Sequence, residues 1–222
     1  MKEDAFKAIE NLFIEESNPA KIQKMTDYMK GRFVYLGITS PERKVILAKI
    51  FQGYKWSREE LLSFTRHCWN SKFRELHYAA LDMMNKHSKK FELEDIPFFE
   101  SLVTTHSWWD TVDSLAVHPI GKTLYKDVDD RRKWVTKWAE SEDLWLRRTA
   151  ILHQLKYKSD LDEDLMEFTI LKANGTKEFF LNKAIGWILR EYSRTNPAYV
   201  LQFCERHDLS NLSRREALRL IT

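Results

Sequence analysis

Apolar residues recur along almost the whole chain at spacings of three, four and seven, which places them on one face of an α-helix. Strict alternation of apolar and polar residues, the pattern of a half-buried β-strand, is not sustained anywhere in the sequence. The pattern therefore predicts an all-α protein, with about a dozen helices joined by short turns.

Residues that start and stop helices stand between these periodic segments. Asparagine or serine followed by proline suits the first turn of a helix, because proline lacks the N–H that would be unpaired there. A serine three residues before a glutamate is the pattern of a capping box, and asparagine-glycine suits a helix end. These signals occur at Asn18-Pro19, Ser40-Pro41, Ser57 with Glu60, Asn174-Gly175 and Asn196-Pro197.

Small residues at comparable places in the longer apolar segments suggest a repeat. Ala79, Ala116, Ala150 and Ala184 are 34 to 37 residues apart, a spacing typical of two-helix repeats. We therefore expect a single domain over residues 1–222, an α-solenoid of HEAT-like helical hairpins with a concave face. A compact irregular helical bundle is the alternative.

The composition is that of an ordinary folded domain, since 43% of the 222 residues are hydrophobic and 31% are charged. The formal net charge of +3 neither requires nor excludes a polyanionic partner. Lysine and arginine gather locally, as at Arg147-Arg148 and at Lys156 with Lys158. Solvated helix faces account for most such clusters, so charge alone does not identify a nucleic-acid partner.

Cys68 and Cys204 are too few and too far apart for a disulfide framework or a zinc site, so we expect free thiols in a reducing cytoplasm. The histidines show no metal-ligand spacing, and we expect neither a metal nor a cofactor. The N-terminal segment is amphipathic and acidic, unlike a secretory signal. No apolar stretch is long enough to span a membrane.

The most specific chemical signal is the segment SWWDTVD. Trp109 and Asp113 are spaced i,i+4, so a helix would place an indole beside a carboxylate, an arrangement able to hold a cation. On the repeat register Arg148 and Trp187 fall on the second helices of the next two hairpins. The alternative is structural: each tryptophan belongs to the core, and Asp113 pairs locally with Arg147 or Arg148.

The same segments resemble the AlkD family of DNA alkylation-repair glycosylases, and the resemblance covers nearly the whole chain. It implies a fold of HEAT-like repeats with a concave DNA-binding face, in a monomer that acts on double-stranded DNA. The motifs that carry it follow in family order: YMKGRFVYLGITSPERK, LHYAALDMM, HSWWD, WLRRTAILHQLKYK and KEFFLNKAIGWILREYSRTNP.

The resemblance implies that Asp113, Trp109 and Trp187 are catalytic. A purine alkylated at a ring nitrogen is cationic, so it departs as a neutral molecule without needing a proton from an acid. Ionised Asp113 would stabilise the positive charge that develops on the deoxyribose and would orient the attacking water. The two indoles would flank the sugar with their π faces.

Arg148, Lys156 and Arg190 are expected to bind phosphates of the DNA backbone, which fixes the register without reading the sequence. The predicted function is that of a monofunctional glycosylase of base-excision repair, located with the bacterial nucleoid. It would release 3-methyladenine and 7-methylguanine types from duplex DNA, without enclosing a flipped base. No lysine is placed to form a Schiff base, so we expect no lyase step.

Two other functions remain open at this point. A non-catalytic HEAT-like protein that binds branched or distorted DNA would release no alkylated base. A HEAT-type scaffold that binds a peptide would show little affinity for a duplex and no salt dependence driven by phosphate contacts.

Overall fold

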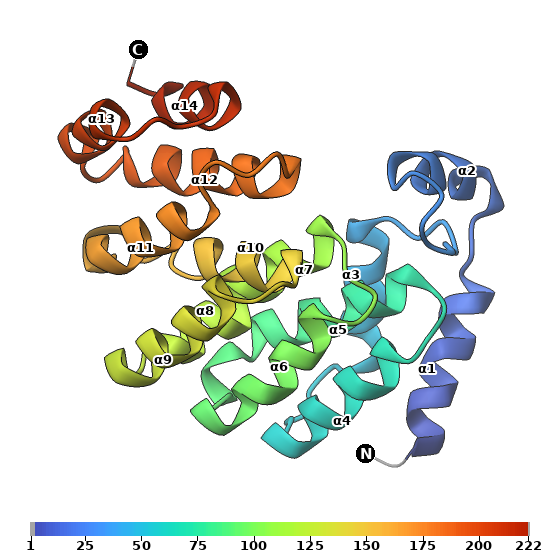
Figure 1. Cartoon of the computed structure of the whole chain (residues 1–222). Coiled ribbons are helices and arrows are strands. Elements are labelled where there is room, and N and C mark those ends of the chain that lie inside the picture. The colour runs from blue at the N-terminus through green and yellow to red at the C-terminus, as the bar shows by residue number, and fades with distance from the viewer. Residues whose placement is uncertain (1–2, 222) are drawn as a thin grey trace. The chain divides into compact units, whose positions relative to one another are not determined.

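The computed structural model describes residues 3–221. Met1, Lys2 and Thr222 lie outside the described residues. Met1 and Lys2 belong to the N-terminal segment, which we predict is not a secretory signal. The chain divides into two compact units, unit 1 (Met1–Lys90) and unit 2 (Phe91–Thr222), both drawn in Figure 1. The single domain over residues 1–222 therefore stays a prediction.

Within residues 3–221 the regular structure is helical, apart from one isolated bridge between Val34 and Phe73, so the all-α prediction is confirmed. Unit 1 consists of α1 (Glu3–Glu15), α2 (Pro19–Tyr28), α3 (Ser40–Ile50), α4 (Arg58–Trp69), α5 (Arg74–Lys86) and the 3₁₀ helix η1 (Ser88–Lys90).

A buried carboxylate in unit 1 holds the turn that leads into α3. One oxygen of Glu75, a fully buried residue of α5, accepts hydrogen bonds from the backbone N–H groups of Leu36 (3.0 Å), Gly37 (2.9 Å) and Ile38 (3.3 Å). Gly37 has φ +83°, and a Cβ there would lie 2.1 Å from the carbonyl oxygen of Asn18, so only glycine fits. The carboxylate thus provides partners for three N–H groups that burial would otherwise leave unsatisfied.

Unit 2 begins with the 3₁₀ helix η2 and continues through nine α-helices, the π-turn η3 and the 3₁₀ helix η4 within its described residues. Their bounds are η2 (Leu93–Asp95), α6 (Ile96–Val103), α7 (Trp109–Leu115), η3 (Ala116–Ile120), α8 (Gly121–Leu124), α9 (Val128–Ala139), α10 (Leu144–Leu152), η4 (Lys158–Asp160), α11 (Glu163–Ala173), α12 (Phe179–Tyr192), α13 (Pro197–Arg206) and α14 (Asn211–Leu218).

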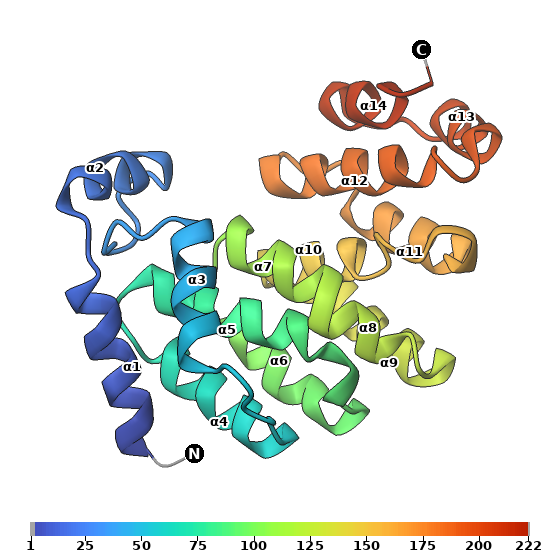
Figure 2. The same ribbon diagram turned by 180° about the vertical axis from the view of Figure 1, so that it is seen from behind.

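Helices of unit 2 pack in two rows. In one row α7 contacts α10, α10 contacts α12, and α12 contacts α14; α9, α11 and α13 pack against these helices, as Figures 1 and 2 show. Helices α7, α10 and α12 begin at residues 109, 144 and 179, which are 35 residues apart. The repeat of helical hairpins predicted from the spacing of Ala116, Ala150 and Ala184 is therefore confirmed within unit 2, and all three alanines are fully buried there.

The predicted helix boundaries agree with the structure, except that α3 begins one residue early, at Ser40 after the Thr39 cap. α2 and α13 begin at Pro19 and Pro197, directly after their asparagine caps. The capping box of α4 is formed, since the Glu60 N–H donates to the Ser57 hydroxyl (3.1 Å) and the Ser57 N–H donates to the Glu60 carboxylate (2.9 Å). α11 ends at Ala173, directly before Asn174 and Gly175, whose φ is +79°.

The helix that starts at α7 widens into a π-turn at Ala116–Ile120. Pro119 lies inside this turn and has no N–H to donate to the carbonyl four residues before it, while its ring clashes with that carbonyl in a regular helix. The wider turn relieves the clash and ends at Gly121, where a Cβ would lie 2.2 Å from the carbonyl oxygen of His153. Hydrophobic periodicity carries no signal for such a turn.

The close contact of α12 with α14 depends on Gly186. A Cβ at this position would lie 2.5 Å from the Cβ of Glu216 and 2.9 Å from the carbonyl oxygen of Ser213. We therefore expect Gly186→Ala to lower the free energy of unfolding by about 1–3 kcal/mol, because one of the helices must shift. Urea denaturation measures this change. The higher helix preference of alanine alone would raise the free energy of unfolding by about 1 kcal/mol. A variant more stable than wild type would therefore contradict the packing argument.

Candidate functional site

Asp113 and Arg148 form a buried ion pair that joins α7 to α10. The Arg148 Nε donates to Asp113 Oδ1 at 2.6 Å and its Nη2 donates to Oδ2 at 2.8 Å, so both carboxylate oxygens are bound by one guanidinium. The Arg148 side chain is 4% exposed and that of Asp113 is 14% exposed. This two-point contact fixes the plane of the carboxylate and leaves part of Asp113 open to solvent.

The same guanidinium reaches the next helix of the row. Arg148 Nη1 donates to the backbone carbonyl of Phe180 in the first turn of α12, and the guanidinium carbon lies 5.8 Å from the centre of the Phe180 ring. One side chain therefore connects α7, α10 and α12, three neighbouring helices of the row, by hydrogen bonds. Of the two local partners considered for Asp113, the structure selects Arg148, whereas Arg147 donates to the carbonyl of Lys172.

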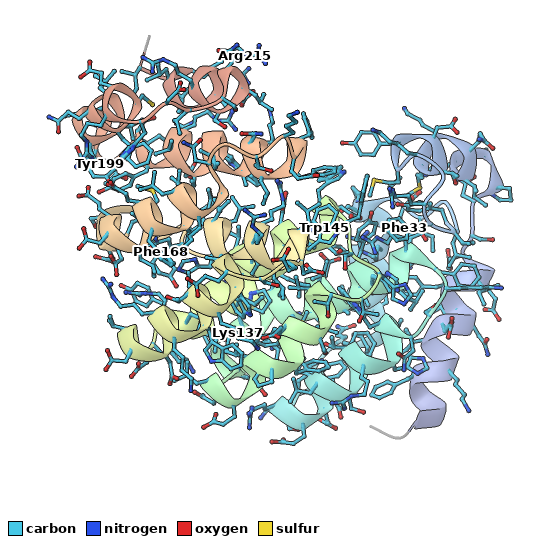
Figure 3. The ribbon with its side chains drawn as sticks, viewed as in Figure 1. Phe33, Lys137, Trp145, Phe168, Tyr199 and Arg215 are labelled. Atoms are coloured by element: carbon cyan, nitrogen blue, oxygen red, sulfur yellow. The ribbon has the colours of Figure 1, made fainter. Side chains whose placement is uncertain are left out.

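Three aromatic rings form a cluster that includes Phe180, whose carbonyl Arg148 binds. Trp108, Trp145 and Phe180 lie with ring centres 5.0 to 5.5 Å apart, and Trp108 meets each of its two neighbours edge to face. Trp145 comes from the first turn of α10 and is labelled in Figure 3. Trp108 is buried directly before α7, Trp145 lies in the first turn of α10 and Phe180 in that of α12, so this aromatic cluster joins the starts of three helices.

Burial raises the pKa of Asp113 above its usual value, the hydrogen bonds and charge of Arg148 oppose that rise, and the charge of Asp110 adds to it. The environment thus makes the charge on Asp113 costly and at the same time supplies a cation that favours it. A carboxylate in this position interacts strongly with any positive charge brought beside it, because little water screens the interaction.

Both predicted catalytic indoles are half-buried. Trp109 is the first residue of α7, one turn before Asp113. Trp187 lies on α12 two turns after Phe180 and packs against the hydrophobic core of unit 2. The i,i+4 relation of Trp109 and Asp113 on one helix agrees with the sequence-based expectation, and the catalytic role of all three residues remains a proposal.

The predicted phosphate-binding residues differ in their surroundings. Lys156 is 56% exposed and pairs with Glu191 at 2.7 Å, whereas Arg190 is 22% exposed and pairs with Glu216, which also binds Lys183 at 2.7 Å. A surface pair such as that of Lys156 is weak, so its ammonium group can exchange partners. Arg148 is the most buried of the three and already holds Asp113.

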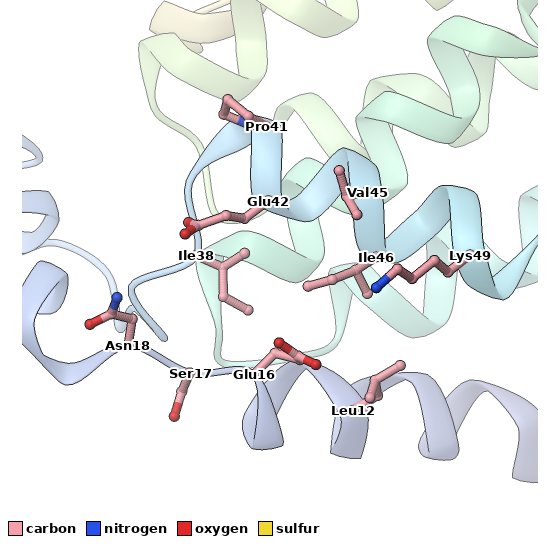
Figure 4. A pocket seen from close by; sticks show the side chains of 10 residues that line it. All are labelled: Leu12, Glu16, Ser17, Asn18, Ile38, Pro41, Glu42, Val45, Ile46 and Lys49. Atoms are coloured by element: carbon pink, nitrogen blue, oxygen red, sulfur yellow. The ribbon is translucent and has the colours of Figure 1, made fainter.

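Unit 1 has a hollow of its own, shown in Figure 4. It has a volume of about 590 Å³ and lies between α1 and α3, with Leu12 on one side and Val45 and Ile46 on the other. Its carboxylate Glu42 is bound by Lys21 (2.5 Å) and by the Thr39 hydroxyl (2.6 Å). These contacts belong to the cap of α3, so they account for the charge of Glu42 without a ligand.

Two further observations concern residues 3–221. No group of three or more histidine, cysteine, aspartate and glutamate side chains is arranged to hold a metal ion in this part of the chain. None of its helices combines the length and the apolar character needed to cross a bilayer.

Phe180, Trp108 and Trp145 did not emerge from the sequence as site residues. Phe180 acts through its backbone carbonyl, which no side-chain pattern can reveal. The one available signal was its position seven residues before Trp187, which places both residues on the same face of a helix. Trp108 and Trp145 stand in the segments WWD and LWLRR, where the sequence pattern indicates ordinary core residues.

Comparison with known proteins shows the family of the chain. A family model described as "DNA alkylation repair enzyme" matches residues 9–221. The chain is 32% identical to a solved structure described as "Predicted DNA alkylation repair enzyme from Enterococcus faecalis", with a TM-score of 0.86 over 93% of this chain and 97% of that one. No curated protein matches it. The resemblance stated from the sequence is confirmed, and the chain belongs to the DNA alkylation repair enzyme family, with a role in the repair of alkylated DNA.

Proposed function

We propose that this protein is a monofunctional DNA glycosylase that hydrolyses the N-glycosidic bond of cationic N-alkylated purines, of the 3-methyladenine and 7-methylguanine types, in duplex DNA. The observation that carries the proposal is the Asp113 carboxylate, which is mostly buried, partly open to solvent and held in one orientation by Arg148. Membership of a DNA alkylation repair family supports alkylated DNA as the substrate.

The chemistry requires little more than such a carboxylate. A cationic purine leaves without protonation, so no general acid is needed. As the bond to the sugar breaks, positive charge develops on the deoxyribose, and a fixed negative charge beside it lowers the barrier. The same carboxylate can orient a water molecule and accept its proton as the new C–O bond forms, which yields an abasic site.

Arg148 contributes by preorganisation. Its guanidinium keeps the carboxylate ionised and fixed, so that little rearrangement is needed when the sugar becomes positive. The anchor on the Phe180 carbonyl fixes the guanidinium in turn. We assign Trp109 and Trp187 to the two sides of the sugar, where each indole face would add about 0.5–2 kcal/mol of cation–π stabilisation.

The DNA would be held by its backbone. Lys156 and Arg190 are the proposed phosphate contacts, which position a lesion without reading its base. Arg148, expected from the sequence to be a third, has its three guanidinium nitrogens engaged by Asp113 and the Phe180 carbonyl, so we assign it to Asp113 instead. The approach through the sugar and phosphates, without enclosing a flipped base, follows from the family resemblance. Among the described residues, Arg148 and Asp110 are the charged groups that shift the pKa of Asp113, and neither is an amine nucleophile, so we propose no lyase step.

The direct test measures base release from duplexes by the purified protein. We expect 7-methylguanine to be released from methylated DNA and uracil to be retained, because neutral uracil needs protonation or a stronger nucleophile to depart. Binding to the duplex without any release would favour a non-catalytic protein of branched or distorted DNA. Absence of duplex binding at low salt would favour the peptide scaffold.

The rate of release should fall on the acid side of a pH profile. Asp113 acts as an anion, and its pKa lies above the ordinary value because burial outweighs the effect of Arg148. As the pH falls through that raised pKa the carboxylate is protonated, so activity is lost at a higher pH than for an exposed aspartate. The test measures single-turnover release of 7-methylguanine from about pH 4, the ordinary pKa of aspartate, up to about pH 8. A rate independent of pH would contradict it.

A further inference from the structure

One carboxylate of α14 holds two cations of α12. Glu216 Oε1 binds the Lys183 ammonium group at 2.7 Å, and Glu216 Oε2 accepts a hydrogen bond from Arg190 Nη1. Glu216 is largely buried, whereas the Lys183 side chain is 37% exposed. Two positive charges therefore share one negative charge, and the triad of Lys183, Glu216 and Arg190 stays positive overall.

The triad lies next to Trp187. An α-helix turns by about 100° per residue, so Lys183 and Arg190 stand about 40° and 60° from Trp187, in the same direction around α12. Gly186 stands about 100° from Trp187 in that direction and faces the Cβ of Glu216. The two cations thus occupy the strip of α12 between the side covered by α14 and the side that bears Trp187. A ligand beside Trp187 would meet them.

The position of Glu216 is set by the close contact of α12 with α14, which lie side by side in Figures 1 and 2. Gly186 leaves room for its Cβ, and the Ser213 hydroxyl of α14 donates to the Asn182 carbonyl of α12 at 2.8 Å. A hydrogen bond from Lys183 lowers the pKa of Glu216, burial opposes this, and the charges of Lys183 and Arg190 lower it further. The ionised carboxylate is therefore held beside both cations at neutral pH.

We propose that Glu216 is an internal competitor of the DNA backbone, a carboxylate that restrains Lys183 and Arg190 and so limits the affinity of the protein for duplex. The proposal rests on the proposed function, in which Arg190 contacts DNA, and deepens it by assigning a residue that opposes the contact. An incoming phosphate would lie close to a fixed negative charge, and little water screens the repulsion from a largely buried group.

Such a competitor would affect how long the protein stays on undamaged DNA. Attraction between cations and the backbone supplies essentially all of the affinity for sites without a lesion. A carboxylate that offsets part of this attraction shortens each encounter, so the protein leaves such sites sooner. Glu216 would thereby limit binding that leads to no repair.

A purely structural role is the alternative, in which Glu216 only joins α14 to α12. The two roles differ in what they change. A structural carboxylate affects the free energy of unfolding, whereas a competitor also affects the number of phosphates that the protein neutralises. The dependence of duplex affinity on salt measures that number.

The test measures the affinity of the full chain for an unmodified duplex across a salt series. Glu216→Gln should bind several-fold more tightly, and the slope of log K against log salt should steepen by about 0.9 for each cation that gains a phosphate. The matched control, Glu205→Gln, removes the same charge from an exposed position of α13 and should leave the slope within error of wild type. Thermal unfolding checks that both variants remain folded.

Lys183→Gln in two backgrounds gives a second measurement. In wild type, where Glu216 holds Lys183, this change should alter the slope little; in Glu216→Gln it should reduce the slope by about 0.9. An unchanged slope in Glu216→Gln, an equal steepening in Glu205→Gln, or equal effects of Lys183→Gln in both backgrounds would overturn the proposal.

These measurements are independent of base release, because the duplex is unmodified. Unchanged slopes together with release of 7-methylguanine would refute only the role of Glu216. The expected slopes without any release would refute only the glycosylase activity.

Discussion

Asp113→Asn is expected to slow the release of 7-methylguanine from methylated duplex by on the order of 10²–10³-fold. Asparagine keeps the size and one of the two oxygen acceptors for Arg148 but lacks the negative charge that stabilises a positive sugar. Affinity for the duplex should change little, because Asp113 contacts no phosphate in this account. Single-turnover release with enzyme in excess measures the chemical step, and duplex binding is measured separately.

Asp110→Asn is the matched control for this variant. It makes the same chemical change three residues earlier in α7, and Asp110 acts on Asp113 only through its charge. We expect release within a few-fold of wild type and an acid limb displaced to lower pH, since a like charge that raises the pKa of Asp113 is gone. Equal rates for wild type and Asp113→Asn would refute the catalytic role of the carboxylate.

Arg148→Met should have the second large effect. It removes the partner of a mostly buried carboxylate, and breaking such a pair costs about 3–5 kcal/mol, with the lower end expected here because Asp113 is 14% exposed. The pKa of Asp113 should rise further, since the remaining influences are burial and Asp110. Activity at neutral pH should therefore fall, and the acid limb of the rate profile should move to higher pH. Urea unfolding and the pH profile measure the two effects.

Two further measurements separate this role from a phosphate contact. If Arg148 served only to bind a phosphate, Arg148→Met would lower duplex affinity and reduce the salt slope by about 0.9, with the pH profile unmoved. In the double variant Asp113→Asn with Arg148→Met no uncompensated charge remains. We expect it to be more stable than Arg148→Met alone, and a double variant that is less stable would contradict the ion-pair argument.

The helical architecture could be predicted because each local signal has a local cause. Proline at the start of α2 and α13, the capping box of α4 and the glycine after α11 act within a few residues. Burial of Ala150 and Ala184 follows from a repeat in which neighbouring helices cross closely. Neither prediction requires knowledge of distant contacts.

The site was only partly predictable for the opposite reason. The spacing of Trp109 and Asp113 is a property of one helix, but the choice of Arg148 over Arg147 depends on how α10 faces α7. The carbonyl of Phe180, the π-turn at Pro119 and the three N–H groups held by Glu75 are all tertiary or backbone features. Side-chain periodicity does not encode them.

The central claim is that ionised Asp113 stabilises a sugar that becomes positive. The most direct measurement compares the affinity of the protein for duplexes that carry a cationic azasugar or a neutral tetrahydrofuran in place of the lesion nucleotide. We predict that wild type prefers the cationic analogue by at least about tenfold, or 1.4 kcal/mol, and that Asp113→Asn loses this preference. Equal affinity of wild type for both duplexes, or a preference that survives in Asp113→Asn, would contradict the claim.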